Sequence, residues 1–139
     1  MTILLAIPHG ARADQRTPVG QWLTENGGGV IAIAPRDGLL YGRIVGLMKL
    51  EPGETPPLDH QGRPRCGLEI IHGLKQDPPG EWFGKITNPE DGRVWDVRVT
   101  LDDAGNLRLR GFLLISLLGA TQVWTPYQGH LGPDCRPLP

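Results

Sequence analysis

Apolar and polar residues alternate with a period of two along the second half of the chain. The alternation runs through residues 81–87, 93–101 and 106–113, and turn-forming residues separate these segments. A strand with this period has one buried face and one solvent-exposed face, so the pattern predicts antiparallel strands. The expected inner face carries Trp82, Gly84, Ile86, Trp95, Val97, Val99, Leu101, Leu107, Leu109, Gly111 and Leu113.

Shorter segments of the same kind occupy the rest of the chain. Further strands are expected over residues 19–24, 30–34, 39–48, 68–74 and 121–124. The segment 68–74 also fits a single helical turn. No amphipathic helix is evident, and seven or eight closely spaced strands predict an all-β fold. An up-and-down antiparallel barrel of about eight strands fits best, and a sandwich is the alternative.

Two similar turns support hairpins within this order of strands. Pro35-Arg36-Asp37-Gly38 and Pro89-Glu90-Asp91-Gly92 each begin with proline and end in Asp-Gly. Proline fixes φ for a turn, and the Asp-Gly pair readily adopts positive φ. The stretch from Leu50 to Arg65 contains four prolines and is expected to be a long surface loop.

The 139 residues suffice for one domain with its own core. The formal net charge is −1 and basic residues form no stripe, so a nucleic-acid partner is not expected. The chain has no run of the roughly 18 apolar residues that a spanning helix needs, so it is not expected to span a membrane. Composition leaves the oligomeric state open.

The start of the chain resembles the end of a secretion signal. Thr2 to Ile7 is largely apolar, and Ala11-Arg12-Ala13 offers the small residues that a signal peptidase reads. We expect residues 1–13 to be a signal remnant, which places the protein in the periplasm or outside the cell. Residues 14–128 then form one barrel domain, and residues 129–139 form a Gly/Pro-rich tail. An ordinary N-terminus is the alternative.

Cys66 and Cys135 are the only cysteines. In an oxidising compartment they can form a disulfide that pins the tail. Two other readings stay open for Cys66: a buried structural thiol, or a reactive thiol whose pKa is lowered by the neighbouring Arg63 and Arg65.

Groups suited to catalysis or metal binding form no motif. Ser116 is the only serine and lies in an apolar run, without a base supplied by any motif. The four histidines are scattered, and three of the four notable aspartates fall in turns. We therefore expect no enzyme, no metal and no cofactor.

Glycines and tryptophans on the inner face indicate where a ligand can bind. Glycine inside a strand marks a bend, a bulge or free space, and ligand sites favour aromatic walls. Trp22 is expected in the core, while Trp82 and Trp95 fit either core or pocket. The expected ligand site is formed by Tyr41 near a rim and by Trp82, Gly84, Trp95, Val97, Leu107, Leu109 and Gly111.

Four motifs in order resemble a bacterial family catalogued as domain of unknown function 2147. The chain has Gly20-Gln21-Trp22 and, after a Pro/Arg-rich loop, Cys66-Gly67-Leu68. The stretch from Trp82 to Gly92 matches the family's Trp-x-Gly and Ile-x-x-Pro-x-x-Gly blocks, and Leu118 to Trp124 matches its closing motif. The resemblance covers residues 18–125.

The resemblance implies an exported barrel similar to lipocalins, in which the Trp of Gly-x-Trp closes the base. The chain departs from the family at Pro126, where an Arg is common, and in the long loop, which keeps only Asp59-His60-Gln61 of the usual stretch. We therefore expect a barrel that binds a small apolar or acyl-chain ligand, with the polar end at the mouth. The alternative is an envelope interaction or structural protein whose barrel is filled by its own side chains.

Overall fold

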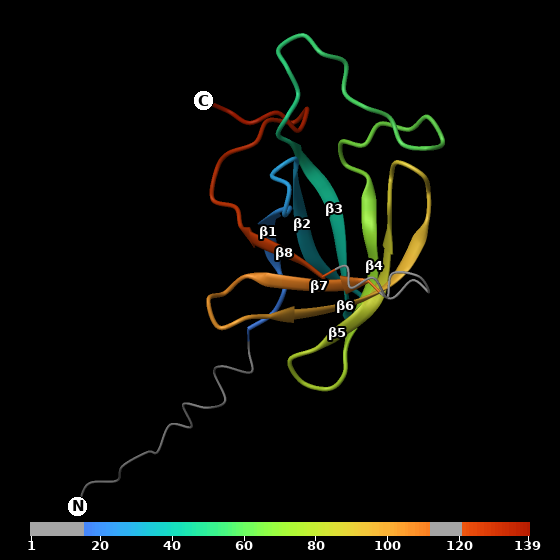
Figure 1. Ribbon diagram of the computed structural model, residues 1–139, viewed down its shortest axis with the longest axis vertical. Helices are drawn as coiled ribbons and strands as arrows, with labels where there is room; N and C mark the ends of the chain where they lie inside the picture. Colours follow the sequence, from blue (N-terminus) through green and yellow to red (C-terminus); the bar gives the residue numbers. More distant parts are fainter. Residues whose placement is uncertain (1–15, 112–120) are drawn as a thin grey trace, which may run out of the picture.

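Eight antiparallel strands form the molecule in the computed structural model, which describes residues 16–111 and 121–139 (Figure 1). The segments expected to be strands are strands, and residues 68–74 form one rather than a helical turn. Across the described parts of the chain, no helix is long and apolar enough to span a membrane. The strands are β1 (Gly20–Leu23), β2 (Gly29–Arg36), β3 (Leu39–Leu47), β4 (Glu69–Gln76), β5 (Trp82–Thr87), β6 (Val94–Leu101), β7 (Leu107–Gly111) and β8 (Thr121–Pro126).

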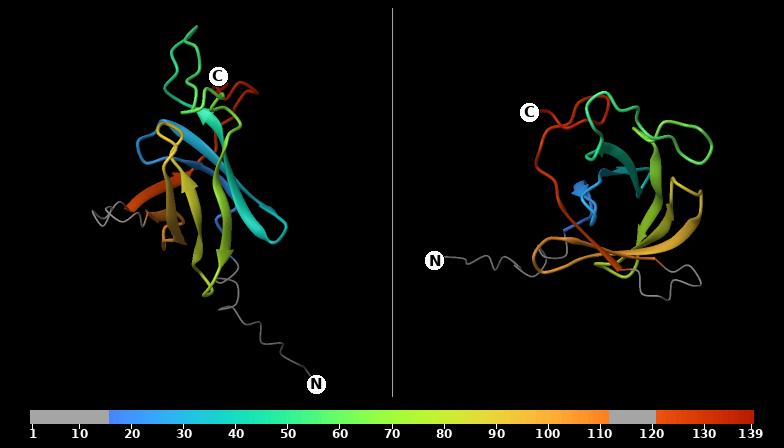
Figure 2. Two further views of the ribbon diagram at one scale, coloured as in Figure 1. Left: turned by 90° about the vertical axis from the view of Figure 1, so that its right-hand side faces the viewer. Right: turned by 45° about the horizontal axis from the view of Figure 1, so that its top comes forward.

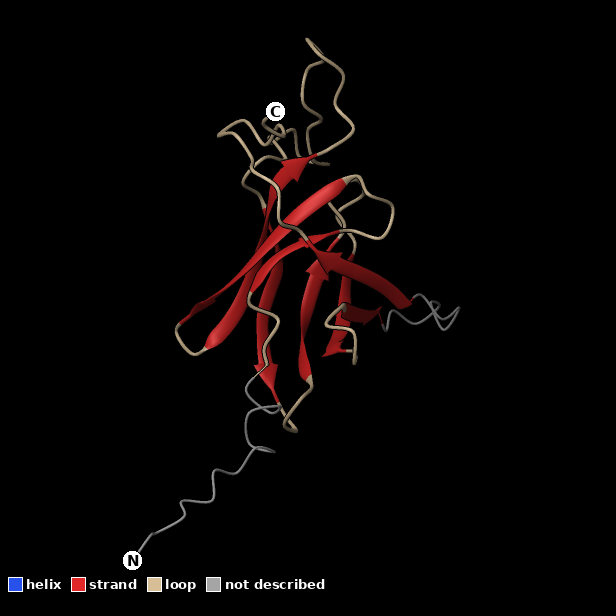
Figure 3. Cartoon of the chain, turned by 90° about the vertical axis from the view of Figure 1, so that its left-hand side faces the viewer, coloured by secondary structure: helices blue, strands red, loops and turns tan. Residues whose placement is uncertain are grey.

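Each strand pairs with the next in the chain, and β8 pairs back onto β1, so the sheet closes into a barrel (Figures 2 and 3). This confirms the up-and-down barrel and excludes the sandwich. The closing pair is short: Trp22 lies opposite Pro126, and Leu23 lies opposite Thr125. Closure removes free sheet edges and gives the barrel an inside and an outside.

The two ends of the barrel differ because of their connections. At one end, short hairpins join β2 to β3, β4 to β5, and β6 to β7. Asp37 and Gly38 form the first of these with φ of 54° and 83°, so the expected four-residue turn narrows to its Asp-Gly pair. At the other end, residues 24–28, 48–68 and 88–93 connect the strands. We call this second end the mouth and the first the closed end.

The core fills the closed end. Trp82 begins β5 directly after a closed-end hairpin, and it lies opposite Val99. Leu107 begins β7 and lies opposite Trp124. These side chains are buried and belong to one apolar cluster with Trp22, Ile31, Ile33, Ile44, Ile70, Ile71, Leu74, Val97 and Leu109. The indole Nε1 of Trp22 donates a hydrogen bond of 2.8 Å to the Pro18 carbonyl, so this buried donor is satisfied.

The C-terminal segment 129–139 packs against the outside of β3 near the mouth (Figure 1). The Cys135 carbonyl accepts a hydrogen bond of 2.7 Å from the Leu47 backbone, and Cys135 is joined to Cys66 by a disulfide. A Cβ at Gly46 would lie 2.8 Å from Val30 and 3.2 Å from Leu131. Glycine at this position therefore lets the tail and β2 approach β3 closely. The pairing of the two cysteines, one reading of the sequence, is present, and the Cys66 thiol is not free.

Three expectations lie outside the described residues: the signal remnant at 1–13, the end of the strand expected over 106–113, and Ser116.

Candidate functional site

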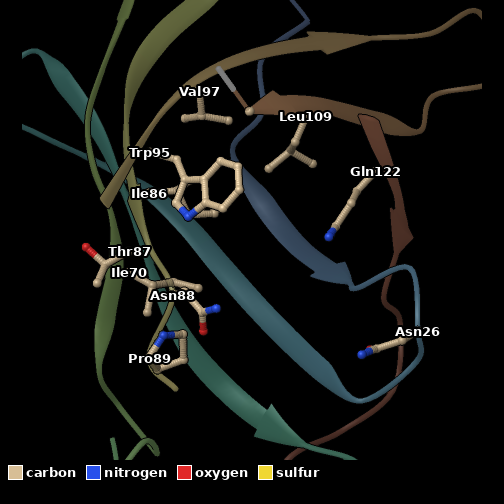
Figure 4. Close-up of a pocket in the computed structure, with 11 residues that line it drawn as sticks. Asn26, Ile70, Ile86, Thr87, Asn88, Pro89, Trp95, Val97, Leu109 and Gln122 are labelled. Atoms are coloured by element: carbon tan, nitrogen blue, oxygen red, sulfur yellow. The ribbon is translucent and has the colours of Figure 1, made fainter. Parts of the chain in front are cut away.

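An open cavity of about 410 Å³ lies inside the barrel at the mouth (Figure 4). Its position follows from the strand register, because Ile86 and Trp95 face each other near the mouth ends of β5 and β6. The volume falls within the range of small-molecule sites. The cavity is lined by apolar Ile70, Ile86, Pro89, Trp95, Val97, Leu109 and Gly111 and by polar Asn26, Thr87, Asn88 and Gln122.

A second hollow of about 370 Å³ continues this cavity toward β1, β2 and β3. The two share Asn26, Ile70, Pro89 and Gln122 as lining residues. They are therefore neighbouring parts of one space at the mouth. Two ionisable residues, Glu25 and Arg65, are among the described residues that line the second hollow. The described lining of the first cavity has none.

The apolar wall comes from the alternation of β5, β6 and β7. Val97 and Leu109 are buried, and the indole of Trp95 extends into the cavity beside them (Figure 4). A Cβ at Gly111 would lie 3.2 Å from Cε3 of Trp95. The indole thus occupies the surface that a larger residue at 111 would cover. The space predicted beside this glycine is therefore occupied by the indole of Trp95.

Three carboxamide side chains lie at the polar rim, and each oxygen is already engaged. Oδ1 of Asn26 accepts a hydrogen bond of 2.8 Å from the Gly28 backbone. Oδ1 of Asn88 accepts one of 2.9 Å from the Glu90 backbone. Oε1 of Gln122 accepts one of 2.8 Å from the indole of Trp124. All three donors are N–H groups, so the oxygen and nitrogen of each amide are assigned without ambiguity.

Four of the eight expected ligand residues line the cavity: Trp95, Val97, Leu109 and Gly111. The structure places Trp82 and Leu107 on the same inner face but deep in the closed end, where they are 4% and 0% exposed. Both belong to the apolar cluster, and neither lines the cavity.

Gly84 and Tyr41 also lie away from the cavity. A Cβ at Gly84 would lie 2.9 Å from the His72 carbonyl and 2.9 Å from Cδ2 of Leu74, so β4 already fills the space beside this glycine. The cause is an irregularity in β4, where Gly73 has a φ of 64° and the register shifts. Tyr41 lies near the closed-end hairpin, and the Arg36 guanidinium stacks over its ring at 3.7 Å.

Sequence reasoning missed all four residues of the polar rim and also the apolar Ile86. Ile86 and Gln122 could have been found, because Ile86 shares its face with Trp82, and Gln122 shares its face with Trp124. Asn26 and Asn88 lie in connections, where alternation gives no direction to a side chain. Their position at the cavity depends on how the strands before and after them are placed.

Thr87 at the cavity edge also ends a chain of polar contacts that runs along the outside of β4 and β5. Nε2 of His72 lies 2.9 Å from Oγ1 of Thr87, and Nδ1 of His72 lies 3.1 Å from Oε2 of Glu69. Glu69 also accepts a hydrogen bond from Arg36 at 3.1 Å. The contacts join the two strands next to the irregular part of β4. No group of three or more His, Cys, Asp or Glu side chains within 16–111 and 121–139 is placed to hold a metal ion.

The comparison with solved structures finds a lipocalin-like fold. The chain is similar to a structure titled "Protein HP1028 from the human pathogen Helicobacter pylori belongs to the lipocalin family", with a TM-score of 0.64 and 18% sequence identity. The match covers 81% of this chain and 84% of the other. At this identity the likeness shows the fold. No curated protein matches the chain.

The family comparison agrees with the four sequence motifs. Residues 20–126 match the family described as "Uncharacterized protein conserved in bacteria (DUF2147)", and this match spans β1 through β8. The chain belongs to this bacterial family, and its fold is a closed, lipocalin-like antiparallel barrel.

Proposed function

We propose that the protein is an exported barrel that binds a small apolar or amphipathic molecule in the cavity at its mouth. The cavity between Trp95, Ile86 and Leu109 carries this proposal, since it combines an apolar wall with a polar rim. A barrel of eight strands is wide enough to hold one small ligand above a packed core. The alternative of a barrel filled throughout by its own side chains accounts less well for an open space of about 410 Å³.

Two features support export. Ala11-Arg12-Ala13 follows an apolar stretch, as at the end of a secretion signal. The disulfide between Cys66 and Cys135 suits an oxidising compartment. Fusing the full reading frame to alkaline phosphatase, which is active only after export, tests the localisation. A fusion protein that accumulates in the cytoplasm without phosphatase activity would contradict it.

The proposal includes binding without turnover. The contacts from Glu69 through His72 to Thr87 have the order acid, imidazole, hydroxyl that activates a nucleophile. However, Glu69 also holds Arg36, and the contacts link two strands at an irregular register. We interpret them as a structural brace. Hydrolysis of p-nitrophenyl butyrate should stay at background; a rate abolished by Thr87→Val would overturn this part.

Titration with N-phenyl-1-naphthylamine tests the binding function. This neutral dye fluoresces in apolar surroundings, so emission should rise and saturate with wild-type protein purified without detergent. Ile86→Asp places a carboxylate on the cavity wall and should weaken binding at least tenfold. Val94→Asp adds the same charge to a neighbouring strand at a residue 51% exposed, and it should bind like wild type.

Circular dichroism of both variants checks that each one folds. Native mass spectrometry of the wild type adds a measurement that needs no variant, because a bound small molecule appears as a mass increment. Absence of dye binding together with absence of any increment would refute the proposal.

A further inference from the structure

The polar rim of the cavity offers hydrogen-bond donors. Nδ2 of Asn26, Nδ2 of Asn88 and Nε2 of Gln122 have no partner among the described residues, while the oxygen of each amide already holds an N–H group. The indole Nε1 of Trp95 is likewise without a partner in the described chain. In Figure 4 the nitrogen atoms of Asn26 and Gln122 point into the same open space.

This arrangement is fixed by the fold. An amide placed on a surface can present either its oxygen or its nitrogen, but here a backbone or indole N–H captures the oxygen. Asn26 is held most firmly, because Oγ1 of Thr24 also donates to its Oδ1 at 3.0 Å. In each of three separate segments, an N–H group binds the amide oxygen and leaves the amide nitrogen free. These segments are the β1–β2 connection, the β5–β6 connection and β8.

Charge at the mouth does not change this polarity. The inner cavity has no ionisable side chain among its described lining residues. In the neighbouring hollow, Glu25 accepts a hydrogen bond of 2.9 Å from the Val123 backbone, and Arg65 donates one of 2.8 Å to the Leu58 carbonyl. One carboxylate and one guanidinium leave no net charge there. Within the inner cavity, selection of a polar group therefore depends on hydrogen bonding, and the side-chain groups without a partner among its described lining residues are N–H donors.

We propose that this rim recognises the carboxylate of an aliphatic acid, with the acid's chain lying against Trp95, Val97 and Leu109. The inference rests on the proposed binding function and names the ligand class for the same cavity. A carboxylate has about four acceptor sites and no donor, which complements several N–H groups. An amine has only donors and would leave both itself and the amides unpaired, at a cost in desolvation.

Three ligands that share the same straight twelve-carbon chain test the assignment: dodecanoic acid, dodecanol and dodecylamine. Each is titrated at pH 7 for displacement of N-phenyl-1-naphthylamine. The acid should bind about tenfold more tightly than the amine, because hydrogen bonds to a charged acceptor are stronger than average. The alcohol, which can both donate and accept, should lie between the two.

Isosteric variants separate donor chemistry from shape. Asn88→Asp and Gln122→Glu keep the oxygen that holds Glu90 or Trp124 and replace the free NH₂ with a second oxygen. The double variant should lose the preference for acid and bind dodecylamine more tightly than the wild type does. Asn106→Asp adds a carboxylate at the closed-end hairpin, and it should retain the wild-type order of the three ligands.

The outcomes distinguish this inference from the binding function itself. If the neutral dye binds but acid and amine compete equally, or if the double variant retains the wild-type order, the carboxylate assignment is overturned and the apolar site stands. If the dye does not bind to wild-type protein, both proposals fall. Dye binding by each single variant, measured first, shows that the cavity is intact.

Discussion

The indole of Trp95 lies across Gly111, with 3.2 Å between its Cε3 atom and the position that a Cβ at residue 111 would occupy. The two residues are on neighbouring strands at the mouth end of the barrel, and both line the cavity. The glycine therefore sets where the aromatic wall of the cavity stands.

Gly111→Leu should push the Trp95 indole into the cavity. We expect at least a tenfold loss of dye binding and a blue or red shift of tryptophan emission, with a loss of stability of about 1–3 kcal/mol from overpacking. Fluorescence titration and urea unfolding measure these effects. Val94→Leu, at an exposed site on the adjacent strand, is the control. Unchanged dye affinity in Gly111→Leu would show that the indole position does not shape the site.

Gly84→Ala should destabilise the fold without acting through the cavity. The added methyl would lie 2.9 Å from the His72 carbonyl and 3.0 Å from that of Gly73, and backbone atoms cannot move aside easily. We expect a loss of about 1–3 kcal/mol in urea unfolding. Gly29→Ala is matched in chemistry, but its nearest contact would be an ordinary 3.6 Å, so its loss should be smaller. Equal losses in the two variants would contradict the close packing at Gly84.

The disulfide should contribute substantially to stability. Cys66 and Cys135 are 69 residues apart in sequence, and in the chain-entropy account a loop of this length is worth about 4 kcal/mol. Reduction of the wild type and the double variant Cys66→Ser/Cys135→Ser should lower the unfolding free energy by similar amounts. Thiol counting on unreduced, denatured protein should find no free thiol. Two free thiols would show that the bond does not form.

Asp59 should make the long loop sensitive to acid. Its burial alone would raise the carboxyl pKa, but hydrogen bonds from the Arg63 and Gln61 backbones and from the Arg63 guanidinium outweigh this, and the pKa is lowered. A lowered folded-state pKa stabilises the protein above the unfolded pKa of about 3.9, and this contribution is lost as the pH falls through the folded value.

The variant Asp59→Asn should therefore be less stable than wild type at pH 6, and the difference should shrink toward pH 2. Urea unfolding at several pH values measures it. A difference that stays constant with pH would mean that Asp59 acts through packing rather than through its charge.

Alternation along the strands was enough to predict the strands and the inner face, because a strand period of two is independent of the rest of the chain. It favoured a barrel but left a sandwich open, since closure depends on the pairing of the first strand with the last. The position along that face was not predictable in the same way. Trp82 and Trp95 share a face, yet one lies in the core and the other at the cavity, since connections far away in sequence decide which end of the barrel is open. The glycine at position 84 predicted free space, but the irregular part of β4 fills that space. The alternation of residues along β4 does not show this irregularity.

Two residues of the polar rim were unpredictable for a related reason. Asn26 and Asn88 lie in connections, and the direction of each amide depends on a backbone N–H two residues further along. Local turn geometry of this kind is common for Asn in any loop. Only the closure of the barrel brings the two connections to the same cavity as Gln122.

The pairing of β1 with β8 is the shortest in the ring of strands: among the described residues it has two residue pairs, and the flanking contacts are hydrogen bonds from the Tyr127 backbone to the Gln21 carbonyl and from the Val123 backbone to Glu25. The tail that follows β8 reaches β3 and is held covalently through Cys135. The chain after β8 is thus fixed to β3, a strand on the other side of the β1–β8 pairing. The disulfide therefore acts as a second, covalent closure of the barrel, independent of the hydrogen bonds between its first and last strands.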